Sequence, residues 1–140
     1  MAKNISTIHI NASPERTWDA LTKPELVKQW QFGSDLITDW KIGSDIRFST
    51  AWEGKLFEQW GKVLEFRPFE VLRYRLFAPR PGLVDKPENY FIMNYLLTSE
   101  NGRTRLDIIQ EDNRTGAVQE EPQGDENSIL QSLKNLIENG

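Results

Sequence analysis

Five aromatic side chains in the middle of the chain are the residues best suited to hold a small apolar molecule: Phe48, Trp52, Trp60, Tyr74 and Tyr95. Each buries a large ring, while the Trp and Tyr side chains keep one hydrogen-bonding group. Ligand pockets are mainly apolar with a few polar groups, so these rings could line one. Plain core packing is the commoner role of such side chains. We therefore expect the rings to face inward, toward either each other or a guest.

Glu58 and Tyr95 are the side chains that the pattern offers as a general acid or base. If Trp60 points inward, Glu58 does too, because residues two apart on a strand share a face. A buried carboxylate is costly unless it is paired or protonated, so Glu58 is either a ligand contact or lies at a solvated end of its strand. Solvation is the commoner case, and we assign no catalytic residue.

Metal and thiol chemistry have little support in the sequence. The chain has no cysteine and a single histidine, His9, which we expect to face solvent on its strand. The acidic stretch Gln110–Asn113 lacks the glycine and alternating ligand spacing of a calcium loop. We predict no metal site and no cofactor.

Length and charge limit the class of protein. A chain of 140 residues has the size of one domain, and we treat residues 1–140 as one. The formal net charge of -4 leaves no basic field for nucleic acid. Neither a signal-peptide core nor a run long enough to span a bilayer is present, so we expect a soluble, cytoplasmic protein.

The first third of the chain predicts a strand and two short helices. Residues Thr7–Asn11 alternate as a half-buried strand does. Ser13, Pro14 and Glu15 form a typical helix start, with a hydroxyl cap, an early proline and an acid in the first turn. A second helix begins at Pro24, and Gly33 ends it.

The middle of the chain predicts an antiparallel meander. From Leu36 apolar residues alternate with polar ones, and turn residues separate the segments at Gly43-Ser44, Glu53-Gly54 and Asn101-Gly102. Between Trp60 and Val63 the apolar positions change parity. We therefore predict a bulge at Gly61 that bends the strand and curves the sheet.

The end of the chain predicts two irregular segments and one helix. Ala78–Asn89 holds three prolines, and Glu111–Glu126 is acidic and rich in turn residues. The last helix has a one-sided apolar stripe and a cap at Asp125 or Asn127. We add Leu130 and Leu133 of this stripe to the candidate ligand contacts, because the stripe must bury itself against a face of the sheet.

The order of these elements resembles the START-like or SRPBCC superfamily (Bet v 1 fold), in the branch similar to the activator of heat-shock protein 90 ATPase. The matching phrases are Asn11-Ala-Ser-Pro-Glu-Arg-Thr-Trp-Asp-Ala-Leu-Thr22, Leu26-Val-Lys-Gln-Trp30, Gly43-Ser44 before Ile46-Arg-Phe48, Gly61-Lys-Val-Leu-Glu-Phe66, Gly102-Arg-Thr-Arg-Leu106 and Leu133-Lys-Asn-Leu136. The resemblance implies an α+β helix-grip fold: a curved antiparallel sheet with two short helices and a C-terminal helix. It also implies a hydrophobic cavity between the sheet and the last helix.

This chain departs from the family pattern at two places. The family commonly has paired glycines where this chain has Gly43-Ser44, and a tryptophan at the start of the last helix where this chain has Glu126 or Asn127. The last helix is also short. If that helix covers the cavity, we expect the pocket to be shallower or more open than in relatives.

Three functions are compatible with these sequence features. The first is a non-enzymatic protein that binds a hydrophobic or aromatic small molecule between the sheet and the last helix. The second is a protein-interaction module, as the resemblance to a chaperone ATPase activator implies. The third is a polyketide-cyclase-like enzyme, which would need an acid or base inside the pocket.

Overall fold

The computed structural model describes residues 2–31, 33–79, 81–112, 114 and 128–139, apart from the side chains of Trp52 and Ser128. A strand comes first, then two short helices, a run of strands and a final helix, as predicted. The bounds are β1 (Ala2–Ile10), α1 (Pro14–Thr22), α2 (Pro24–Trp30), β2 (Asp35–Thr38), β3 (Asp45–Trp52), β4 (Lys55–Arg67), β5 (Val71–Phe77), η1 (Pro87–Asn89), β6 (Phe91–Glu100), β7 (Arg103–Asp112) and α3 (Ser128–Asn139).

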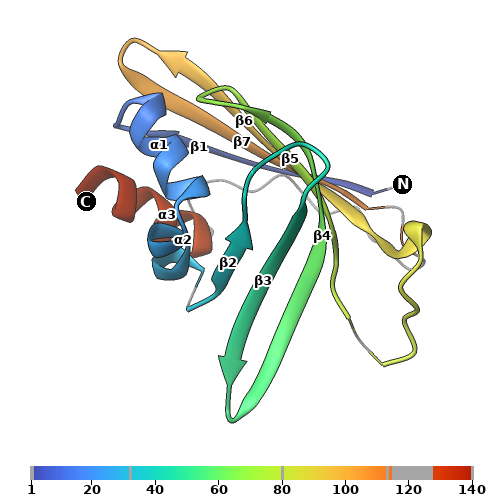
Figure 1. The fold of residues 1–140 in the computed structure, drawn as a ribbon. Helices are drawn as coiled ribbons and strands as arrows, with labels where there is room; N and C mark the ends of the chain where they lie inside the picture. The colour runs from blue at the N-terminus through green and yellow to red at the C-terminus, as the bar shows by residue number, and fades with distance from the viewer. Residues whose placement is uncertain (1, 32, 80, 113, 115–127, 140) are drawn as a thin grey trace.

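The strands form one antiparallel sheet in the order β1-β7-β6-β5-β4-β3-β2. Strands β2 to β7 are a meander in which each strand pairs with the next, and β1 adds to the free edge of β7. Figure 1 shows the three helices gathered on one side of this curved sheet. The predicted α+β class, with a curved antiparallel sheet and a C-terminal helix, is confirmed.

Two short helices follow β1, and they begin at the residues that the sequence predicts. The Ser13 side chain accepts a hydrogen bond from the Arg16 N–H at 3.3 Å, and prolines open both helices. The indole of Trp30 donates to the Ala20 carbonyl at 2.8 Å, and that of Trp40 donates to the Thr22 carbonyl at 2.9 Å. These bonds fix both helices to each other and to the segment that leads into β3.

The hairpin turns lie where the sequence places them. Asn101 and Gly102 have φ angles of 52° and 86°, and Glu100 pairs with Arg103 on either side of them. This is the two-residue connection that Asn-Gly favours, because both residues tolerate positive φ. Glu53 and Gly54 make the same kind of turn between β3 and β4.

Three details of the prediction need correction. The first strand is longer than Thr7–Asn11, because pairing with β7 runs from Ala2 to Ile10. Glu111 and Asp112 belong to β7 rather than to a loop. The bulge in β4 lies between Val63 and Glu65, not at Gly61. Within the rest of the acidic segment the structure describes only Arg114. The predicted caps of α3, Asp125 and Asn127, lie outside the described residues.

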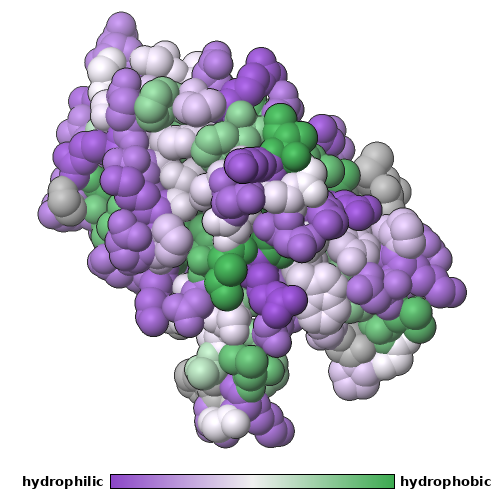
Figure 2. Space-filling model, viewed as in Figure 1, coloured by the Kyte–Doolittle hydropathy of each residue, from purple (hydrophilic) through white to green (hydrophobic). Residues whose placement is uncertain are grey.

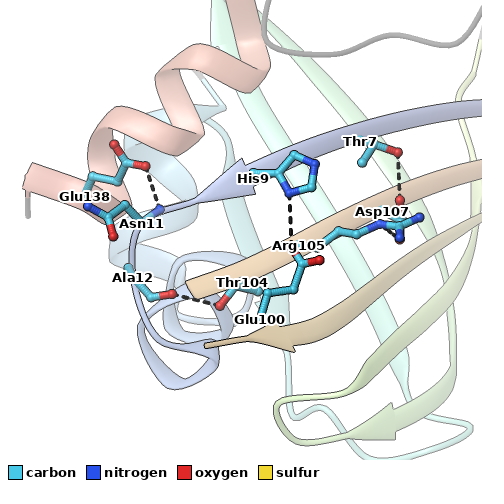
Figure 3. A network of polar contacts seen from close by, with 9 residues as sticks. All are labelled: Thr7, His9, Asn11, Ala12, Glu100, Thr104, Arg105, Asp107 and Glu138. Carbon is cyan, nitrogen blue, oxygen red and sulfur yellow. Dashed lines mark hydrogen bonds and ion pairs between the residues drawn. The ribbon is translucent and has the colours of Figure 1, made fainter. Parts of the chain in front are cut away.

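Helix α3 packs on α1, α2 and the edge strand β1. Its apolar stripe buries Leu130, Leu133 and Ile137 in the core. At its C-terminal end, Glu138 accepts a hydrogen bond at 2.7 Å from the backbone N–H of Asn11, just after β1 (Figure 3). The helix is thereby held at the β1 side of the concave face, away from the middle strands.

Gly61 brings the middle strands unusually close together. It lies on the concave face of β4, opposite Ile46 of β3 and Leu76 of β5. A Cβ atom at this position would lie 1.7 Å from the carbonyl oxygen of Arg75. Only glycine permits this approach, which is a common reason for glycine within a strand.

We expect Gly61→Ala to destabilise the fold by about 3 kcal/mol, since β5 would have to move away from β4. Urea denaturation measures the loss. Gly54→Ala at the hairpin turn is the matched control: its Cβ would meet no atom within 4 Å, although φ is +76°. That change should cost only about 1–2 kcal/mol from backbone strain. Equal losses in the two variants would contradict the steric account.

Candidate functional site

A cavity of about 280 Å³ opens on the concave face of strands β3 to β7. Aromatic and aliphatic side chains line it from three strands: Phe48, Tyr74, Leu76, Phe91, Met93 and Tyr95. Three glutamines complete the described lining: Gln31 after α2, Gln59 on β4 and Gln110 on β7. The volume is near the lower end of the range for small-molecule sites.

Three of the predicted ring residues meet at this cavity. The rings of Phe48 and Tyr74 lie 5.8 Å apart between centroids, and those of Tyr74 and Tyr95 lie 5.9 Å apart. Phe48 is on β3 and Tyr74 on β5, so β4 runs between them. The register places Gly61 between these two positions, and its missing side chain leaves room for the rings to meet.

Tyr74 and Tyr95 form a buried hydroxyl pair beside the cavity. Their side chains are 3% and 5% exposed, and their hydroxyl oxygens lie 3.1 Å apart in a hydrogen bond in which either can donate. Burial raises the pKa of both hydroxyls, because a phenolate would lose its hydration, and the Tyr95 neighbour raises the pKa of Tyr74 further. The pair is therefore neutral under ordinary conditions.

Trp60 does not join the other rings, because it lies on the opposite face of the sheet. Its indole donates to Asp85 at 2.9 Å and packs beside Phe77, 5.4 Å away between centroids. The predicted bulge at Gly61 would have turned Trp60 inward with Val63. Since β4 is regular up to Val63, residues three apart point to opposite faces, and only Val63 points inward.

The face with Trp60 has a second hollow, of about 320 Å³, with a different chemistry. It is lined by charged side chains that already have partners: Arg47 with Glu58 at 3.2 Å, and Lys62 with Asp45. The Arg75 guanidinium lies 4.9 Å from the centre of the Tyr90 ring. Glu58, the acid predicted as either a ligand contact or a solvated group, is therefore in an ion pair and away from the aromatic cavity.

The remaining predicted ligand contacts are not among the described residues that line this cavity. Trp52 ends β3, but its side chain is not among those described. Leu130 and Leu133 are buried on α3, and no described residue that lines the concave cavity comes from that helix. They secure α3 in the core rather than facing this hollow.

The sequence interpretation missed the three glutamines, Phe91 and Met93. Phe91 and Met93 share a face with Tyr95, so their alternation on β6 was the available signal. Gln59 was missed because the bulge predicted at Gly61 placed its neighbour Trp60 on the inner face instead. Gln110 faces the concave side with Met93, its partner across β6 and β7.

The described residues contain no group of three His, Cys, Asp or Glu side chains that could hold a metal ion. His9 lies on the outer face of β1, where its Nδ1 is 3.1 Å from Glu100 (Figure 3). Among the described residues, no helix is long and apolar enough to cross a membrane.

Comparison with known proteins identifies related chains. The model of the family described as activator of Hsp90 ATPase homolog 1-like protein matches residues 11–138. A protein from Cytophaga hutchinsonii has a solution structure that is similar, with 33% identity, a TM-score of 0.73, and coverage of 96% of this chain and 94% of that one. No protein with a curated description matches the sequence.

Two more distant structures share the fold. A Nitrosomonas europaea protein has 17% identity and a TM-score of 0.73, over 99% of this chain and 95% of that chain. The Aha1 dimer from Colwellia psychrerythraea has 20% identity and a TM-score of 0.67, over 99% and 97%. The helix-grip fold implied by the sequence is thereby confirmed.

The raised pKa values of the tyrosine pair predict a loss of stability at high pH. Below about pH 10 both tyrosines are neutral in the folded and the unfolded state, so their contribution to stability is complete. Above that pH the unfolded state loses their protons first, because the folded-state pKa values are raised, and stability falls. The double variant Tyr74→Phe, Tyr95→Phe should lose less stability than wild type between about pH 10 and 12. Urea denaturation across this range checks it. Identical slopes for the two proteins would show that the pair does not titrate with unfolding.

Proposed function

Because this chain belongs to the family of activator of Hsp90 ATPase homolog 1-like proteins, we propose that it binds small molecules, holding a hydrophobic or aromatic ligand in the concave cavity. The observation that carries the proposal is the lining itself. Rings from Phe48, Tyr74 and Tyr95 border a hollow large enough for a guest, and they do not fill it. Affinity would come mainly from the burial of apolar area.

Helix α3 supports this function indirectly. Leu130 and Leu133 hold it at the β1 side of the concave face, so the cavity is bordered by the middle strands and by Gln31 after α2. A ligand would therefore sit beside the helices rather than beneath α3.

The test is a titration with N-phenyl-1-naphthylamine, an uncharged dye whose fluorescence rises when it leaves water. Wild type should increase the emission with saturation. Met93→Trp should weaken binding at least about tenfold, because the indole fills the cavity while remaining apolar.

The matched control removes an exposed apolar side chain on the β3–β4 hairpin that is not part of the described cavity lining. Leu56→Gln should bind the dye as wild type does, since Leu56 is 63% exposed. If Met93→Trp binds normally, or if Leu56→Gln abolishes the signal, the dye occupies the surface and the cavity proposal fails.

A second candidate is a protein-interaction module that acts on Hsp90, as the family description suggests. The observation that favours it is the end of the β3–β4 hairpin, where Leu56 and Phe57 are 63% and 53% exposed. Figure 2 shows apolar residues on this projecting end of the molecule. The two residues are consecutive in β4, so they present apolar surface on both faces of the hairpin end. Exposed apolar surface on a projecting element often marks a binding site.

This second candidate predicts a change in the ATP hydrolysis of a bacterial Hsp90. Wild type should raise the hydrolysis rate, and the double variant Leu56→Ser, Phe57→Ser should lose most of the effect while keeping its own melting temperature. Met93→Trp, which alters the cavity alone, should still stimulate. No stimulation by wild type at any molar ratio would remove this candidate.

A further inference from the structure

The Tyr74–Tyr95 pair has one more donor than the described protein uses. Two hydroxyl groups carry two protons, and the single bond between them occupies one. Neither hydroxyl makes another hydrogen bond with the residues that the structure describes. The second proton is therefore left for an acceptor that enters the cavity.

The surroundings of this donor determine which acceptor fits. Tyr74 and Tyr95 are among the most deeply buried side chains that line the cavity. No Asp, Glu, Lys, Arg or His is among the described residues of the lining. A charged acceptor at this depth would lose its hydration without meeting an opposite charge, which is costly. A neutral oxygen avoids that cost.

The three glutamines extend the same chemistry toward the opening. Gln31, Gln59 and Gln110 are less buried than the tyrosines, and each offers both a donor and an acceptor without a charge. None of their side-chain amides forms a hydrogen bond with the described residues. They can therefore bind further neutral polar groups of a ligand whose ring lies deeper.

Building on the proposed function, we propose that the ligand of this cavity is a neutral, ring-bearing molecule with a carbonyl or similar acceptor oxygen, and that the Tyr74–Tyr95 hydroxyl pair donates a hydrogen bond to that oxygen. The tyrosines are positioned for this role by register. Tyr74 pairs with Met93 on β6, and Tyr95 lies two residues further along the same face. The hydroxyl pair thus supplies orientation, and the rings supply area.

Three naphthalene probes of similar ring size test this proposal: naphthalene, 2-acetylnaphthalene and 2-naphthoate. Displacement of N-phenyl-1-naphthylamine measures their affinities. The ketone should bind about five- to tenfold more tightly than naphthalene, the gain of one buried hydrogen bond. The carboxylate should bind more weakly than the ketone, by at least about tenfold, because its charge has no partner in the cavity.

The double variant Tyr74→Phe, Tyr95→Phe separates the hydrogen bond from the packing. Removing both hydroxyls together leaves no unpaired polar group, so the fold and the affinity for naphthalene should be kept. The preference for the ketone should disappear. Tyr90→Phe is the matched control, because Tyr90 borders the hollow on the other face, and its ketone preference should equal that of wild type.

The outcomes distinguish this inference from the proposal that it rests on. If naphthalene and the ketone bind equally, or if the carboxylate binds most tightly, the donor role is overturned while the cavity still binds ligands. A ketone preference that survives in the double variant also overturns it. If the dye binds but no probe displaces it, the donor role is likewise overturned. If neither the dye nor any probe binds, the proposed function is overturned together with the inference.

Discussion

The close approach of β4 and β5 at Gly61 shapes the middle of the sheet and the concave cavity beside it. No side chain fits there, because the Arg75 carbonyl occupies the space. The bulge that follows, between Val63 and Glu65, brings Val63 and Phe66 to the same concave face and increases the local twist. The sheet therefore bends across its middle strands, and the rings of Phe48 and Tyr74 come together over a strand that has no side chain between them.

The helices cover only part of the bent face, and this explains why a hollow is left. Helix α3 is held at the β1 side by its buried leucines and by the Glu138 contact with Asn11. Among the described residues, the hollow on this face is bordered by aromatic rings, three carboxamides and a hydroxyl pair, none of them charged under ordinary conditions. On the other face, ion pairs cross the same strands. The two sides of one sheet thus offer very different surroundings to a small molecule.

Much of this arrangement could be predicted from the sequence, because local signals agreed with the fold. Ser13 and Pro14 mark the first helix, Asn101-Gly102 marks a hairpin, and alternation places Phe48, Tyr74 and Tyr95 on one face. Trp60 was misplaced, because the change of parity between Trp60 and Val63 was interpreted as a bulge, whereas β4 is regular there and Trp60 points to the other face of the sheet. Gln59 was missed for the same reason, and Gln110 was missed because polar residues in a strand ordinarily face water. The stripe with Leu130 and Leu133 predicts burial, but not the element that buries it.

Met93 can report whether an uncharged aromatic molecule occupies the concave hollow. The chain has two methionines, and Met93 lines the cavity. With 13C-labelled methionine methyl groups, NMR should show the Met93 signal moving on titration with 2-acetylnaphthalene and nuclear Overhauser contacts between this methyl group and the ring protons. The Met1 signal should stay in place. An unmoved Met93 methyl signal at saturating ligand, without such contacts, would show that the molecule does not bind in this hollow.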